Sequence, residues 1–117
     1  MYQSSAALKI TNSVNKNRAN AYLVNDILDA SPQKLLIRIY DFAIAQSKSG
    51  NLEKTNKALM ELISALRYDN DEVSQISIGL KRLYEFCQDQ MRKQNYSIVV
   101  KILTDLRESW IAALSSQ

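Results

Sequence analysis

Three acidic residues near the middle of the chain, Asp69, Asp71 and Glu72, lie close enough in sequence to suggest general acid–base catalysis. They also fall where a helix is expected to begin. Carboxylates there interact favourably with the positive end of the helix dipole, so we interpret them as capping residues. The sequence has no histidine and one cysteine, Cys87, which removes the commonest general base, the commonest metal ligand and any intramolecular disulfide. The composition therefore predicts that the protein is not an enzyme and holds no metal or cofactor, and that Cys87 is a small buried apolar residue.

Charge is distributed unevenly along the chain. The first 21 residues contain Lys9, Lys16 and Arg18 and no acid, whereas basic and acidic residues balance from Tyr22 onward. We expect residues 1–21 to form a mobile basic arm and residues 22–117 to form a single helical-bundle domain. Three charges release few counterions, so nucleic acid is not a predicted partner. No apolar run has the length of a signal peptide or a membrane span, which predicts a cytoplasmic protein without membrane insertion.

Turn-forming residues are scarce, with only two glycines and one proline, which favours a few long helices over a sheet with many turns. Apolar spacing predicts helices over residues 32–48 and 52–67, a third helix that follows a connection at residues 68–71 and ends at residues 95–97, and a fourth from Ser97 to near the C-terminus. Ser31, Asn51 and Ser97 are suited to cap helix starts, and Gly50 is suited to end the first helix. We therefore predict an all-α fold, an antiparallel four-helix bundle. A short extra helix or cap segment is expected over residues 21–28.

Apolar residues cover an unusually wide arc of the first predicted long helix. One face carries Leu35, Ile39 and Phe42, and the adjoining face carries Leu36, Tyr40, Ala43 and Ile44. Two explanations remain open: a central helix with several neighbours, or a helix that uses part of this arc to receive an apolar partner.

The third predicted helix has the clearest period. Its expected core residues are Val73, Ile76, Leu80, Leu83, Tyr84, Cys87 and Met91. Ile37, Ile44, Ile78 and Phe86 lie beside the core stripes of their helices. If these four form a contiguous exposed patch, that patch would mark an interface.

Three segments of the chain are similar to motifs of one known family. They are the run Ile27-Leu28-Asp29-Ala30-Ser31-Pro32-Gln33-Lys34-Leu35-Leu36 with Tyr22 before it and Ile39-Tyr40-Asp41 after it, then Leu83-Tyr84-Glu85-Phe86, then Leu106-Arg107-Glu108-Ser109-Trp110. This order resembles the flagellin-specific export chaperones, the FliS family. Asp29 stands where that family usually has threonine. Phe42 stands where it usually has glycine and would fill either a close helix contact or part of a groove. Two helix connections at one end of the bundle are also shorter, by about 10 Å at 1.5 Å per residue.

The resemblance implies a cytoplasmic chaperone that binds the disordered C-terminal segment of flagellin, prevents premature polymerisation and passes subunits to the export apparatus. It also implies that a segment containing Tyr22, Ile27 and Leu28 covers part of the groove until the client displaces it. Candidate groove residues are Leu36, Tyr40 and Ile44, with Ile37, Ile78 and Phe86 added from pattern alone. The alternative is a bundle of the same kind that binds a different amphipathic helix, such as a flagellar regulator. If Tyr40 lies in the groove, Tyr40→Ala should weaken client binding more than it lowers stability.

Overall fold

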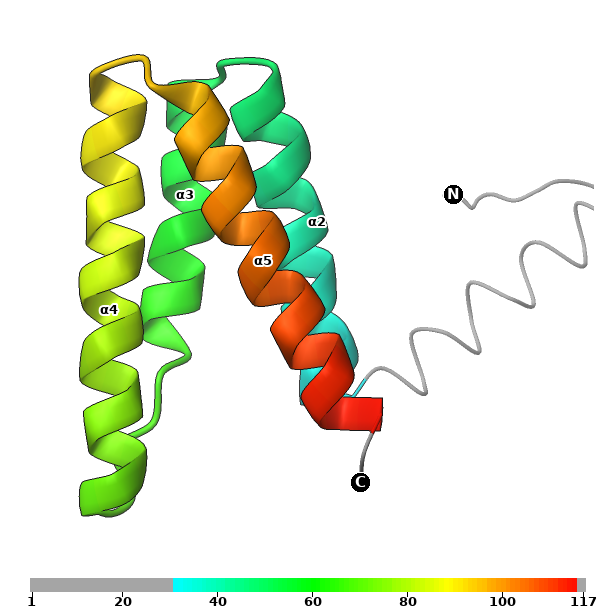
Figure 1. The fold of residues 1–117 in the computed structure, drawn as a ribbon, viewed down its shortest axis with the longest axis vertical. Helices are drawn as coiled ribbons and strands as arrows, with labels where there is room; N and C mark the ends of the chain where they lie inside the picture. Colours follow the sequence, from blue (N-terminus) through cyan, green and yellow to red (C-terminus); the bar gives the residue numbers. More distant parts are fainter. Residues whose placement is uncertain (1–30, 116–117) are drawn as a thin grey trace, which may run out of the picture. The chain divides into compact units, whose positions relative to one another are not determined.

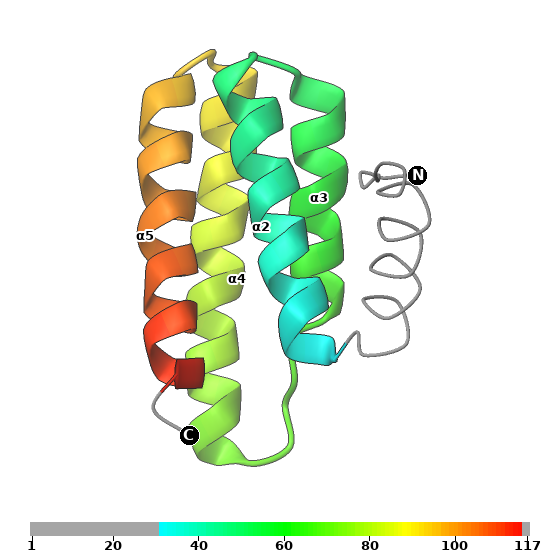
Figure 2. The same cartoon turned by 90° about the vertical axis from the view of Figure 1, so that its right-hand side faces the viewer.

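The computed structural model describes residues 31–115 and confirms the all-α prediction. Four helices follow one another: α2 (Pro32–Lys48), α3 (Leu52–Ser64), α4 (Asp71–Arg92) and α5 (Tyr96–Ser115). They pack as an antiparallel bundle in which the α2–α3 and α4–α5 connections lie at the same end (Figures 1 and 2). From Leu35 onward the chain forms one compact unit. The predicted arm and the predicted short helix over residues 21–28 lie outside the described residues.

Side-chain caps fix three of the helix starts. The Ser31 hydroxyl accepts a hydrogen bond from the backbone N–H of Lys34 at 3.2 Å. Asn51 accepts from the N–H of Lys54 at 3.0 Å at the start of α3, and Asn70 accepts from the third residue of α4. Each bond satisfies an amide that has no partner within its own helix. The caps predicted at Ser31 and Asn51 are confirmed.

Two tight turns close the shared end of the bundle. Gly50 has a φ of +72° after α2, as its predicted role requires, and Gln94 has a φ of +63° after α4. A Cβ on Gly50 would lie 2.9 Å from the ring of Tyr96, so the two connections are in direct contact. Helix α5 begins at Tyr96, and therefore the prediction that Ser97 caps it is wrong.

The second helix is shorter than predicted, because it ends at Ser64 instead of Arg67. The N–H of Ala65 bonds to the carbonyl of Glu61, and the next amide bonds only three residues back, so the last turn tightens and stops. The Ser77 hydroxyl of α4 then donates to the carbonyl of Arg67 and holds the following segment in place. Apolar spacing alone predicted a longer helix. In the structure the carbonyl of Arg67 instead accepts a hydrogen bond from a side chain of α4.

The core lies between all four helices. Its buried apolar residues are Tyr40, Ala43, Ala58, Leu59, Leu62, Tyr84, Cys87, Met91, Val99 and Leu103. Cys87 is buried as predicted. Ile76 was expected in the core but is 60% exposed, and Leu83 is half-buried. Helix α4 has 22 residues and α3 has 13, so Ile76 lies near an end of α4 that extends past its neighbour (Figure 1).

Among residues 31–115, no helix combines the length and the apolarity needed to cross a membrane.

Candidate partner-binding surface

Helix α2 carries apolar side chains on two sides. One side packs into the core through Tyr40 and Ala43, and the other side exposes Leu35 and Phe42, each 46% accessible. Part of the wide apolar arc therefore belongs to the core, and another part is exposed at the surface. The residues of one face of the arc, Leu35, Ile39 and Phe42, line a surface groove.

This α2–α3 groove has a volume of about 480 Å³. Its lining residues are Leu35, Arg38, Ile39 and Phe42 from α2 and Lys54, Lys57, Ala58 and Glu61 from α3. Each set follows the i, i+3, i+4, i+7 spacing of one helix face, so the two faces run along each other. Figure 2 shows α2 and α3 side by side over this length.

The spacing of the helices explains why a groove forms there. Backbones approach each other most closely between α3 and α4 and between α4 and α5, whereas α2 makes no comparably close approach. The small side chain of Ala58 faces this groove from α3, opposite the larger apolar side chains of α2. The groove therefore lies between two helices whose backbones do not approach closely.

A second hollow, of about 320 Å³, lies at the end of the bundle where α3 stops short. Leu36 lines it from α2, Ile76 and Leu80 from α4, and Trp110 from α5. Its remaining lining comes from the end of α3 and the segment that follows, together with Val73, Ser77 and Tyr84. Ile76 is thus exposed into an apolar cleft and not onto a fully polar surface.

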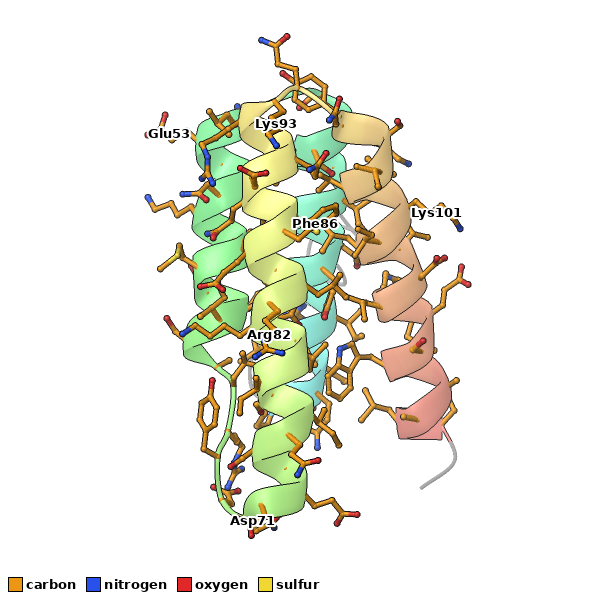
Figure 3. All side chains as sticks on the ribbon, turned by 60° about the vertical axis from the view of Figure 1, so that its left-hand side comes forward. Glu53, Asp71, Arg82, Phe86, Lys93 and Lys101 are labelled. Carbon is orange, nitrogen blue, oxygen red and sulfur yellow. The ribbon has the colours of Figure 1, made fainter. Side chains whose placement is uncertain are left out.

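The predicted site residues fall in several places. Leu36 is half-buried and lines the second hollow, Ile37 and Ile44 are half-buried, and Ile44 packs against the core. Ile78 and Phe86 are exposed on α4, where Figure 3 shows Phe86 and Arg82 on the ribbon nearest the viewer. Tyr22, Ile27 and Leu28 lie outside the described residues. Neither hollow is lined by Ile37, Ile44, Ile78 or Phe86, so these four do not meet in either one.

Tyr40 requires a correction, because the structure places it in the core and not in a groove. It is completely buried, and its hydroxyl forms a hydrogen bond with that of Tyr84 and accepts another from the indole N–H of Trp110 at 3.0 Å. The two tyrosine rings are tilted, with centroids 6.4 Å apart. Burial raises the pKa of both tyrosines above their ordinary value of 10.0. Tyr40 therefore helps to hold α2, α4 and α5 together and presents no surface to a partner.

The three motif segments that resemble the flagellin chaperones meet at the hydrogen-bonded side chains of Tyr40, Tyr84 and Trp110. Tyr40 comes from the first segment, Tyr84 from the second and Trp110 from the third. Beside them, the Arg107 guanidinium of the third segment donates to the Asp41 carboxylate of the first. Packing of the bundle thus explains Tyr40, Tyr84 and Trp110 and the Arg107–Asp41 pair, and the groove is lined mainly by residues outside the motifs.

Sequence reasoning did not name Leu35 and Ile39 as groove residues, because helical spacing alone does not say which of two adjacent faces points inward. Ile39 is half-buried, so it contacts the core and also lines the groove. Phe42 was recognised as unusual, and of its two predicted roles the structure shows the groove.

The chemistry of the groove is that of a binding surface. Hydrocarbon from Leu35, Ile39 and Phe42 forms one wall, and lysine side chains on α3 can lay their apolar stems along the other while their amines remain in water. The one thiol lies elsewhere in the core, where burial raises the pKa of Cys87 to about 12 and keeps it protonated and unreactive. Among residues 31–115, no group of His, Cys, Asp and Glu is arranged to hold a metal ion.

The fold and the groove together describe a small four-helix bundle with an open apolar groove between α2 and α3. Comparison with models of protein families, with curated proteins and with solved structures found no match to this chain. The resemblance to the flagellin chaperones therefore rests on the three motif segments alone.

Proposed function

We propose that this protein is a flagellin export chaperone, or a close relative of one, and that it binds an amphipathic segment at the C-terminal end of flagellin. The observation that carries the proposal is the α2–α3 groove, with Leu35 and Phe42 each 46% exposed along one apolar face. Exposed large apolar residues gathered in a groove favour a binding role, since burying them against a partner is the available gain in free energy.

The proposed mechanism follows from the client's own chemistry. A flagellin end that has not yet polymerised carries an apolar stripe that would pair with other copies. A helix laid in the groove hides that stripe from other subunits. The client orders only when it binds, and the cost of this ordering keeps the complex reversible, so the subunit can be released for export from the cytoplasm.

The size of the apolar contribution can be worked out for Phe42. Its exposed 46% corresponds to about 90 Å², taking about 200 Å² for a phenylalanine side chain. Burying that area contributes about 2 kcal/mol at roughly 25 cal/mol per Å². Replacing Phe42 by serine should therefore weaken client binding by about 30-fold.

Calorimetry with the C-terminal segment of flagellin from the same genome tests the proposal. The wild-type chain should bind at micromolar concentration or better, and Phe42→Ser should lose about 30-fold in affinity. Ile98→Ser is the matched control, since Ile98 is 41% exposed on α5 and lies outside both hollows. Circular dichroism must show that both variants are folded at the temperature of the titration.

Two results would count against the proposal. Absence of binding at high micromolar concentration would contradict flagellin as the client. If a different amphipathic helix from the source cell then bound with the same dependence on Phe42, the alternative of a binding module for another client would replace it. Equal losses in Phe42→Ser and Ile98→Ser would show that the groove is not the site.

A further inference from the structure

The rim of the α2–α3 groove is more basic than the chain around it. Arg38, Lys54, Lys57 and Glu61 line it, three cations and one carboxylate, whereas acidic and basic residues balance over the chain from Tyr22 onward. Lys54 and Lys57 are exposed and one helical turn apart on α3, and among residues 31–115 neither forms an ion pair with an acid. Two other lysines of the described chain, Lys93 and Lys101, each have an aspartate partner, so the pair on α3 is available to a ligand where those two are not.

We infer that this groove selects a helical segment whose apolar stripe is flanked by acidic residues one turn apart. This inference rests on the proposed function and adds the charge pattern of the client to it. Leu35, Ile39 and Phe42 provide the apolar wall for the stripe, and the two lysines provide the opposite wall. Carboxylates of a bound helix at i and i+3 or i+4 have the same separation as Lys54 and Lys57, so one helix can pair with both.

The same geometry defines what the groove disfavours. A helix with lysine or arginine beside its apolar stripe would bring like charges together along α3, which costs free energy and slows association. Glu61 lies one turn beyond Lys57 on the same face, so the acidic preference should be confined to the half of the groove near Lys54. Selection by charge would complement the apolar contacts, which by themselves accept many sequences.

Two designed helical peptides test the inference with the full chain. Both carry the same leucines at i, i+3, i+4 and i+7, and they differ only in having glutamate or glutamine beside that stripe. The glutamate peptide should bind about three- to tenfold more tightly at about 50 mM salt, the range expected for two exposed ion pairs. The ratio of the two affinities should fall toward one at about 1 M salt, where the Debye length is only about 3 Å.

Charge-reversal variants test whether Lys54 and Lys57 cause the preference for the glutamate peptide. The double variant Lys54→Glu and Lys57→Glu should invert the preference, and the neutral variant Lys54→Gln and Lys57→Gln should abolish it. Lys81→Glu with Arg82→Glu changes the net charge equally on α4, outside the groove lining, and should retain the preference. Figure 3 shows Arg82 on α4, with α2 on the far side of the bundle.

The outcomes separate this inference from the proposed function. If the two peptides bind the wild-type chain equally, or if the α4 control removes the preference as strongly as the α3 variants do, the inference is wrong. If the flagellin segment still binds and still requires Phe42, the proposed function survives that result. If neither the designed peptides nor the flagellin segment binds, both fail together.

Discussion

Removing the Tyr40 hydroxyl tests whether this residue acts in the core, as the structure shows, or in partner binding. The substitution Tyr40→Phe keeps the ring and deletes the one atom that bonds to both Tyr84 and Trp110. The Tyr84 hydroxyl is then buried without its partner, since Tyr84 is only 1% exposed. Trp110 is half-buried, so its N–H can reach water at lower cost.

The expected loss follows from these two bonds. A buried hydroxyl left without a partner costs about 1–3 kcal/mol, and the bond from the indole adds about 1 kcal/mol. Tyr40→Phe should therefore lower the free energy of unfolding by about 2–4 kcal/mol. Tyr84→Phe deletes one bond and should cost less. The double variant should cost less than the sum of the two single variants by about 1 kcal/mol, since it leaves no orphaned hydroxyl between the rings.

Equilibrium unfolding in urea, followed by far-ultraviolet circular dichroism, measures these differences. Tyr68→Phe is the control, because Tyr68 is 52% exposed and its hydroxyl forms no bond among the described residues. It should change the unfolding free energy by less than about 0.5 kcal/mol. The reasoning is refuted if Tyr40→Phe matches this control or if the two core substitutions simply add. Affinity for the flagellin segment should change less than about twofold in folded Tyr40→Phe, and a large loss of affinity at unchanged stability would return Tyr40 to the binding site.

Three further predictions concern stability. Thr55→Val should raise the unfolding free energy by about 1 kcal/mol in the same urea assay, because it removes a buried hydroxyl that has no hydrogen-bond partner among residues 31–115; a loss would mean that the hydroxyl has a partner. Gly79→Ala should raise the thermal midpoint, since no atom lies within 4 Å of its added methyl and alanine favours the helix by about 0.8–1.0 kcal/mol, whereas Gly50→Ala should lower it through its positive φ and the adjacent aromatic ring. Burial raises the pKa of Cys87 from 9.0 to about 12 and raises that of Tyr84, so their stabilising contribution is complete below about pH 9 and is lost as pH rises toward 12. Urea titrations across this range should show a fall of up to about 1.4 kcal/mol per pH unit for each group, with a shallower fall between pH 9 and 10 in Cys87→Ala.

Local signals in the sequence were sufficient for most of the fold. Ser31 located the start of α2, and Gly50 with Asn51 located the α2–α3 connection, because their chemistry acts on backbone groups within a few residues. The end of α3 was not predictable in this way. It depends on the bond from Ser77 to the carbonyl of Arg67, ten residues away, which exists only after the helices have packed.

The sequence indicated that α2 carries surplus apolar surface. It did not indicate which residues of α2 would form the exposed groove. The arc around α2 correctly indicated that this helix has more apolar surface than a core alone requires. Helical spacing could not assign Leu35 and Phe42 to the outside and Tyr40 to the inside, because the two faces are adjacent and about equally apolar. The assignment depends on which side of α2 meets the hydroxyl of Tyr84 and the indole of Trp110, which come from distant parts of the sequence.

The central claim is that a foreign amphipathic helix lies in the α2–α3 groove. A nuclear magnetic resonance titration of the isotope-labelled chain with the flagellin C-terminal segment tests it most directly, since each backbone amide reports separately. We expect the largest shift changes at the amides of Leu35, Ile39, Phe42 and Ala58, with little change along α4. Saturable changes centred instead on Ile78 and Phe86, or no change at peptide concentrations in the high micromolar range, would contradict the claim.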